Sequence, residues 1–406
     1  TKLTDHPSLH VRCCTVTEMA PLPAEMFINH AALQALAKLN PLVEDAPWSA
    51  GDEPPSSGND HGRKEGRRTI ASSGGNVIGA KRIGSDFTPA PDPPWVKSRN
   101  DVLEAVVKRQ AAIFESIDKH AITVTLPDGK TKSGIAFVTS PLDVATAISK
   151  GLAQACCVAS VCYLARIKSP LEDGMVTMAN GPDDDEDAEG LQGWELWDMN
   201  RPLEGSCELK LHKFCDPEGQ TTFWHSSAHI LGEALESLYG AQLTHGPPTG
   251  NGFFYDSYMG HAAMDKEKVA QLEKKAKQIV EQKQPFERVV VTKEECLTIF
   301  ESNPFKQALI SSKLPDGSLT TVYRCGPFID LCKGPHLPNT GCVKAFKLTK
   351  NSTALWLGQA GNDELQRVYG IAFADKKELK EWEHLQEEAE KRDHRRLGVQ
   401  QELFYF

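Results

Sequence analysis

The chain has 406 residues, of which 40% are hydrophobic and 25% are charged, so it is long enough for two or three domains. Acidic residues outnumber basic ones by 55 to 45, and the net charge of −10 argues against binding nucleic acid through one large basic face. No apolar run approaches the roughly 18 residues of a membrane-spanning helix, so no membrane role is indicated. Eleven cysteines without an even framework of spacings predict reduced thiols and no disulfides.

Residues 1–118 are predicted to form an N-terminal extension, largely flexible with helical segments. The chain opens on Thr1 with the features of neither a secretory signal nor a transit peptide, so we expect it to be part of a longer protein. From Asn40 to Lys97 it is rich in Pro, Gly, Ser and charge, and such a composition buries too little apolar surface to order the chain. Apolar residues at helical spacing predict helices over Ala24–Leu39 and Val102–Ile117.

Residues 119–216 begin with the pattern of a β-hairpin. Alternation over Ile122–Leu126 predicts a strand in which successive side chains point to opposite faces. Pro127-Asp128-Gly129 then predicts a turn, and a second strand is expected over Gly134–Phe137.

A helix and two more strands are predicted after this hairpin. Ser140 as N-cap and Pro141 as first helical residue predict a helix with an apolar stripe that reaches Leu152. The later strands are expected at Val158–Tyr163 and Cys207–Leu211. Between them, residues 171–193 are predicted to be an inserted loop, because the acidic run Asp183–Asp187 repels itself. The pattern indicates a small β-grasp domain with an acidic insertion.

Residues 217–374 are predicted to form a mixed domain of helices and strands. Ser226–Tyr239 has the spacing of an amphipathic helix, and it ends at Gly240, which suits a left-handed cap. A second helix over Asp265–Gln282 stops before Pro285. Strands are expected at Val289–Val291, Thr321–Tyr323 and Ala345–Leu348.

Two capping patterns predict further helices. Thr292 with Glu295 is the signature of a capping box for a short helix. Asp375 with Glu378 opens a long charged helix, and residues 375–406 are predicted to form a linker that leads out of the domain. The predicted fold class is therefore α+β, with a β-grasp domain, a mixed domain and a linker helix.

His225 and His229 lie four residues apart on a predicted helix, so their imidazoles share one face and can address one metal ion or one substrate. Such pairs also arise by chance in structural helices. The zinc-protease pattern needs Glu directly after the first His, and this position is Ser226, which argues against a metalloprotease.

Cys332 and His336 flank a turn-rich stretch in which Gly334 and Pro335 bend the chain. With the helical pair they supply three imidazoles and one thiol, a set that zinc accepts in a tetrahedral site. The same groups could instead hold the terminal ribose of an RNA and a hydrolytic water, with a neutral imidazole as base. The residues alone do not choose between these alternatives. Further polar candidates, each of a type more often found at a surface or boundary, are Lys306, Tyr255 and Asp330.

Four motifs in order closely resemble the editing domain of threonyl-tRNA synthetases, namely Trp224–Ile230, Asn251–Asp256, Tyr323–His336 and Leu365–Gly370. Upstream, Val124–Lys130 and Arg201–Leu203 resemble the TGS domain, the ubiquitin-like β-grasp module that precedes editing in this family. Downstream, Arg392–Gly398 resembles the linker into the class II aminoacylation core. The amino-acid sequences of these motifs are more similar to those of eukaryotic cytosolic enzymes, and this resemblance implies a cytoplasmic location. Residues 1–118 and 171–193 have no counterpart in this resemblance.

The resemblance implies an editing site and its reaction. Serine lacks one methyl of threonine, a difference worth only roughly 1–3 kcal/mol of binding, so a second site is needed to hydrolyse mischarged seryl-tRNA. The implied partners are the 3′ acceptor end of tRNA and the serine moiety, with no membrane. Ligase activity, ATP, zinc and homodimerisation are expected only of the full-length protein, so no cofactor is expected in this portion. The implied site residues are His225, His229, Cys332 and His336, with Lys306, Tyr255 and Asp330 as companions.

Two alternatives to this interpretation stay open. The quartet also resembles the zinc site of alanine-type editing domains, which would make the chain a zinc-dependent aminoacyl-tRNA deacylase. The TGS-like segment and the absence of a synthetic core are also compatible with a non-catalytic tRNA-binding or regulatory module.

Overall fold

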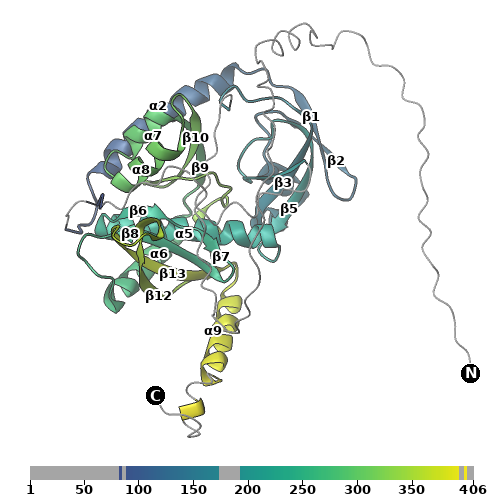
Figure 1. Ribbon diagram of the computed structural model, residues 1–406. Helices are drawn as coiled ribbons and strands as arrows, with labels where there is room; N and C mark the ends of the chain where they lie inside the picture. Colours follow the sequence, from purple (N-terminus) through teal and green to yellow (C-terminus); the bar gives the residue numbers. More distant parts are fainter. Residues whose placement is uncertain (1–81, 85–87, 173–192, 393–396, 400–406) are drawn as a thin grey trace, which may run out of the picture. The chain divides into compact units, whose positions relative to one another are not determined.

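The structure is a computed structural model that describes residues 82–84, 88–172, 193–392 and 397–399 (Figure 1). All of them belong to one compact unit, residues 72–406. The helix predicted over residues 24–39 and the acidic run at 183–187 lie outside the described residues. The described residues mix helices and strands, which confirms the predicted α+β class.

The first domain is a five-stranded sheet with two short helices. Its elements are β1 (Ala121–Thr125), β2 (Thr131–Ile135), α3 (Pro141–Ile148), α4 (Lys150–Ala155), β3 (Cys156–Arg166), β4 (Trp194–Trp197) and β5 (Gly205–Lys213). The strand order is β2-β1-β5-β3-β4, and β1 pairs antiparallel with β2 but parallel with β5. This is the ubiquitin-like β-grasp arrangement that the sequence predicted. Its core is formed by buried apolar side chains that include Val124, Val144, Trp197 and Leu209.

The second strand of the hairpin begins earlier than predicted. The turn closes when the Leu126 N–H donates to the carbonyl of Lys130 (2.9 Å), so pairing resumes at once in β2. Phe137, expected in the strand, lies outside it with φ 60°. Its N–H donates instead to the carbonyl of Leu203 (2.8 Å) and its ring joins the core.

The single helix predicted from Ser140 to Leu152 is two helices. Ser140 and Asp143 form the capping box of α3, which confirms the predicted start. Ser149 is extended (φ −163°, ψ 146°) and ends α3, and its hydroxyl accepts a hydrogen bond from the Leu152 N–H to start α4. A serine that caps a new helix offers the backbone an alternative to continuing the old one, and the apolar stripe does not show this break.

The helix that carries the histidine pair is α5 (Pro217–Tyr239), which begins before the predicted Ser226. Pro217 takes the first helical position, where a missing N–H costs nothing. Gly219 lies so close to β5 that a Cβ there would come within 1.8 Å of the carbonyl oxygen of Lys213. Gly240 ends the helix at φ 58°, as predicted. This helix contacts strands of the first domain and of the second, so it links the two.

The second domain contains two sheets. The three-stranded sheet, in the order β11-β10-β9, consists of β9 (Phe286–Thr292), β10 (Leu319–Cys325) and β11 (Phe328–Leu331). The other sheet has the order β12-β13-β8-β6, with β7 paired to β8. Its strands are β6 (Gln242–His245), β7 (Pro248–Thr249), β8 (Gly252–Tyr258), β12 (Ala345–Leu355) and β13 (Glu364–Phe373). The three strands predicted in this region are confirmed, and all are longer than expected.

The helices of the second domain follow their capping signals. Asp265 caps α6 (Lys266–Gln282), and Thr292 with Glu295 forms the predicted capping box of α7 (Lys293–Ile299). The helix α8 (Pro304–Lys313), whose cap is the side chain of Asn303, was not predicted. The final helix is α9 (Lys376–Lys391). Here Asp375 accepts from the Lys377 N–H, but Glu378 Oε2 has no hydrogen-bond partner among the described residues, so the predicted capping box is wrong.

Two further findings concern the whole described part of the chain. None of its helices combines the length and apolar character needed to cross a membrane. Its nine cysteines are all free thiols.

The helix predicted over Val102–Ile117 begins sooner, as α2 (Trp95–Ser116), and the residues just before it are also ordered. The prediction of flexibility up to Lys97 is wrong at this end, because the N–H groups of Ala90 and Asp92 donate to carbonyls at the end of α5. Figure 1 shows α2 beside α7 and β9. Its apolar face packs into a core with side chains of those elements, including Leu103, Val106, Val291 and Ile299.

Arg99 fixes α2 to α5 through a buried ion pair. Both guanidinium NH2 groups donate to the carboxylate of Glu236, one of them at 2.7 Å, and both side chains are shielded from water. Arg99→Ala leaves an uncompensated buried carboxylate, so we expect the free energy of unfolding, measured in urea, to fall by about 3–5 kcal/mol. Lys97→Ala is the control on the same helix, since the Lys97–Asp101 pair is exposed and should contribute little. Equal effects of the two substitutions would contradict this prediction.

Candidate functional site

The structure brings the predicted quartet together. His225 and His229 lie one turn apart on α5, with ring centroids 5.1 Å apart. Cys332 and His336 follow β11, and the His336 ring lies 4.4 Å from that of His225 and 4.2 Å from that of His229. Helix and loop therefore meet, although more than a hundred residues separate them.

Cys332 lies at the centre of this group. Its Sγ is 3.3 Å from Nε2 of His225 and 3.3 Å from Nε2 of His336, and it accepts the Gly334 N–H at 3.2 Å. Gly334 has φ 72°, and a Cβ there would meet the hydroxyl oxygen of Tyr323 at 2.0 Å. The loop can take this shape only with glycine at this position.

The three companion residues form a second group beside the quartet. Asp330 on β11 accepts hydrogen bonds from Lys306 Nζ on α8 (2.6 Å) and from the Tyr255 hydroxyl on β8 (2.5 Å). Lys306 and Asp330 are each only 4% exposed. His229 Nε2 lies 3.7 Å from Asp330 Oδ2 and connects the two groups. All seven predicted residues thus occupy one buried region.

Burial sets the protonation of the quartet. It lowers the pKa of His225 to about 3 and that of His229 to about 4, and it lowers the pKa of His336 well below its ordinary value. Burial also raises the pKa of the Cys332 thiol far above its ordinary range. At neutral pH, in the metal-free chain, the cluster holds three neutral imidazoles and an un-ionised thiol.

Asp330 stays ionised in the same region. Burial is the largest single influence and would raise its pKa, but the charge of Lys306 and hydrogen bonds from Lys306 and Tyr255 outweigh burial and hold the pKa below the ordinary value. A fixed ammonium–carboxylate pair therefore borders the neutral quartet.

Ser226, whose position in the sequence argued only against a metalloprotease, orients His336. Its hydroxyl donates to the carbonyl of Thr222 (2.9 Å) and lies 3.0 Å from Nδ1 of His336. Because a hydroxyl has one proton, Nδ1 of His336 is the donor in the second bond, and Nε2 faces Cys332 without a proton. A serine directly after the first histidine is the signal that could have suggested this role.

Two other neighbours were missed. His245 on β6 is half-buried, and loss of hydration lowers its pKa to about 4. Asp198, which follows β4 in the first domain, accepts hydrogen bonds from the His336 N–H and the Tyr323 hydroxyl, each at 2.7 Å. No local motif marks Asp198, because its partners are far away in sequence.

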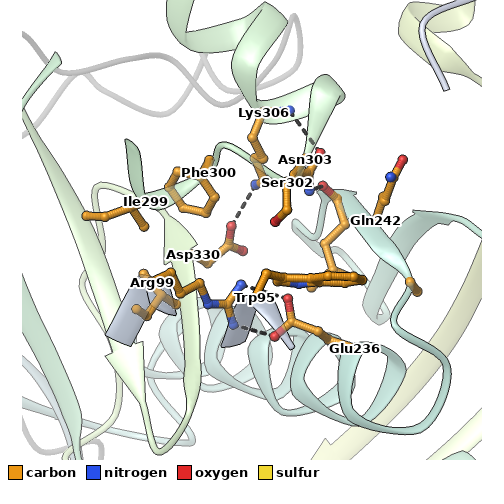
Figure 2. A pocket seen from close by; sticks show the side chains of 13 residues that line it. Trp95, Arg99, Glu236, Gln242, Ile299, Phe300, Ser302, Asn303, Lys306 and Asp330 are labelled. Carbon is orange, nitrogen blue, oxygen red and sulfur yellow. Dashed lines mark hydrogen bonds and ion pairs between the residues drawn. The ribbon is translucent and has the colours of Figure 1, made fainter. Parts of the chain in front are cut away.

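A pocket adjoins the Lys306–Asp330 pair (Figure 2). The side chains of Trp95 and Arg99, both from α2, lie across it from Lys306. The wall around the ammonium–carboxylate pair is thus completed by α2.

The quartet fits a zinc ion by its donor set. One ligand atom from each of the four residues lies within 4.8 Å of all the others. His229 Nδ1 is buried and has no hydrogen-bond partner among the described residues, so it is available as a ligand. The hydrogen bond that Nδ1 of His336 donates to the Ser226 hydroxyl is also the kind of contact that orients a metal-binding imidazole.

Comparison with known proteins assigns both domains. Residues 122–213 match the TGS domain, and residues 320–369 match the threonyl and alanyl tRNA synthetase second additional domain. The chain is 44% identical over 314 residues to a probable cytoplasmic threonine–tRNA ligase 1 of Dictyostelium discoideum. The aligned residues cover 77% of this chain and 40% of that protein. The chain belongs to the threonyl-tRNA synthetase family. The resemblance stated from the motifs is confirmed.

Other members of the family match over the same extent. Cytoplasmic threonine–tRNA ligase of Caenorhabditis elegans is 42% identical over 81% of this chain and 41% of its own length. Cytoplasmic threonine–tRNA ligase 1 of Homo sapiens is 41% identical over 78% of this chain and 40% of its own length. The chain therefore spans about two fifths of the length of these threonyl-tRNA synthetases, and that part contains the TGS and editing domains.

Proposed function

We propose that this chain hydrolyses seryl-tRNA that a threonyl-tRNA synthetase has charged in error. The observation that carries the proposal is the meeting of the quartet with the Lys306–Asp330 pair inside the domain that matches the editing family. Neutral imidazoles, an ammonium group and a buried carboxylate are the groups that ester hydrolysis by water uses.

In the proposed reaction, the quartet and Lys306 have different roles. A neutral imidazole of the quartet accepts a proton from water as the water oxygen attacks the ester carbonyl. In this proposal the Lys306 ammonium group, which is hydrogen-bonded to Asp330, stabilises the oxyanion that develops. The bond between the carbonyl carbon and the ribose oxygen then breaks, and the proton passes to that oxygen to give free serine and tRNA. The Cys332 thiol stays protonated, so it orients its neighbours rather than attacking the ester.

The same proposal covers the selection of serine, the binding of tRNA and the role of the full-length protein. The site selects serine by excluding the additional methyl of threonine, since steric exclusion discriminates against a larger substrate where binding alone cannot. The 3′ end of the tRNA is bound locally, because the net charge of −10 offers no broad basic surface. Threonine–tRNA ligation with ATP, dimerisation and a cytoplasmic location are proposed for the full-length protein.

His225→Ala tests the assignment. We expect the rate of deacylation of seryl-tRNA for threonine to fall at least tenfold, because the variant removes one imidazole of the quartet. His120→Ala is the matched control, since His120 is exposed and lies ahead of β1. Equal deacylation rates in the unsubstituted chain and in His225→Ala would show that the quartet takes no part in the reaction. Tight tRNA binding without hydrolysis in any variant would favour a binding module.

A zinc-dependent deacylase is the second candidate, because the quartet offers four zinc donors within 4.8 Å of one another. His225, His229, Cys332 and His336 would hold the ion. Bound zinc would supply Lewis-acid polarisation of a carbonyl or a water of lowered pKa. One zinc per chain by elemental analysis, together with activity that is lost in chelator and restored by zinc, would support this candidate. Full activity in chelator would support the metal-free reaction.

A further inference from the structure

The first domain contributes a buried carboxylate to the site of the second. Asp198 follows β4 of the TGS domain and is only 8% exposed. Its Oδ1 accepts the backbone N–H of His336 at 2.7 Å, and its Oδ2 accepts the hydroxyl of Tyr323 at 2.7 Å. Both donors belong to the editing domain, so both carboxylate oxygens bond across the boundary between the domains.

These two bonds control the position of one imidazole. The His336 N–H lies on the backbone that carries the ring, and the Tyr323 ring contacts this imidazole at a centroid distance of 4.5 Å. Phe286 stacks on the same imidazole at 4.9 Å with an interplanar angle of 8°. Ser226 holds Nδ1. Without Asp198, the backbone and one of the ring's neighbours lose their acceptor, while Phe286 and Ser226 remain.

Other contacts hold the two domains together without touching the quartet. Glu172 of the first domain forms an ion pair with Arg288 of β9 at 2.9 Å, and the Asn200 side chain donates to the carbonyl of Pro338 at 2.8 Å. Docking of the domains therefore does not depend on Asp198 alone. The role of Asp198 can be separated from docking by experiment.

We propose that Asp198, supplied by the TGS domain, is a positioning residue of the editing site, which fixes His336 through its backbone N–H and through Tyr323. The catalytic part of this inference rests on the proposed function. It also assigns the TGS domain a purpose within this reaction: the editing domain has its full geometry only when the TGS domain is docked.

Steady-state deacylation of seryl-tRNA tests the proposal in three variants. Asp198→Ala should lower kcat about 10- to 100-fold, as loss of an orienting contact does, with KM changed less than about twofold. Asp198→Asn should keep kcat within about threefold, because the amide oxygen still accepts the His336 N–H and its NH2 group can donate to the Tyr323 oxygen. Glu172→Gln is the control at the same domain boundary and should leave kcat unchanged. Equal losses of kcat in Asp198→Ala and Glu172→Gln would overturn the positioning role.

Histidine NMR provides a readout independent of activity. In chain labelled with 15N-histidine, Asp198→Ala should shift the Nδ1 and Nε2 signals of His336, while Asp198→Asn and Glu172→Gln preserve them. Unchanged His336 signals in a folded Asp198→Ala chain would overturn the inference. If the unsubstituted chain deacylates nothing, the proposed function fails, and the NMR result still decides whether Asp198 positions His336.

Discussion

Lys306→Met is expected to lower the rate of seryl-tRNA hydrolysis about 10²- to 10³-fold, because it removes the only positive charge bonded to Asp330 among the described residues. The same substitution leaves a buried carboxylate without its counter-charge. The free energy of unfolding should therefore also fall, by about 3–5 kcal/mol. Deacylation assays and urea denaturation measure the two effects on the same preparation.

A double variant separates catalysis from stability. Lys306→Met combined with Asp330→Asn removes both charges, so much of the lost stability should return while hydrolysis stays low. Lys313→Met, an exposed position at the end of the same helix, is the control and should change neither quantity much. Recovery of hydrolysis in the double variant would contradict a role for the ammonium group in the reaction.

Acid is expected to destabilise the metal-free chain well above the pKa of its carboxylates. Unfolded histidines bind protons below about pH 6.5, whereas folded His225 and His229 do so only near about pH 3 and 4. The unfolded state therefore binds more protons in this window, and stability falls as pH falls. These two residues alone predict a loss of about 3 kcal/mol between pH 6.5 and pH 5, because unfolded histidines are half protonated at about pH 6.5 and the slope reaches about 1.4 kcal/mol per residue per pH unit only below it.

Other titratable groups also change how the free energy of unfolding depends on pH. His245 and His336 make the chain less stable as pH falls, because burial lowers their pKa as well. Glu233 acts in the opposite direction: burial raises its pKa to about 7, so protonation in the folded state stabilises the chain as pH falls. Urea denaturation in chelator at several pH values measures the net slope. His229→Gln should reduce it by about 1.4 kcal/mol per pH unit, and the exposed control His120→Gln should not. Identical slopes for His229→Gln and the parent chain would show that His229 is not held neutral by the fold.

Local signals in the sequence were sufficient to predict some of the elements whose ends are capped by side chains, although α8 with its Asn303 cap was missed. The helix α6 begins after Asp265 and α7 after Thr292, as predicted, because these caps act within one turn. The break at Ser149 was missed, since the apolar stripe continues across it. Strands β6, β8 and β13 were not predicted as strands. The pairing of β13 with β8 joins residues far apart in the sequence and leaves no local pattern, but β6 pairs with β8 close by in the sequence and was missed all the same.

In the candidate site, too, some residues could be predicted from the sequence and others could not. The shared face of His225 and His229 was predicted from helical spacing, and Cys332 and His336 were assigned to the site from the order of the motifs. Tertiary contacts such as the one from Asp198, which spans 138 residues to His336, leave no local pattern. They depend on how two domains dock, and only the folded chain shows this.

The packing of α2 decides where this chain can be shortened. Leu103 and Val106 cover apolar side chains of β9 and α7, while Arg99 neutralises Glu236. A chain trimmed to the hairpin that starts at Ala121 would expose that apolar patch to water and leave the carboxylate uncompensated. Such a product should aggregate during expression even though it retains every residue of the quartet. An active minimal enzyme must therefore start ahead of Trp95.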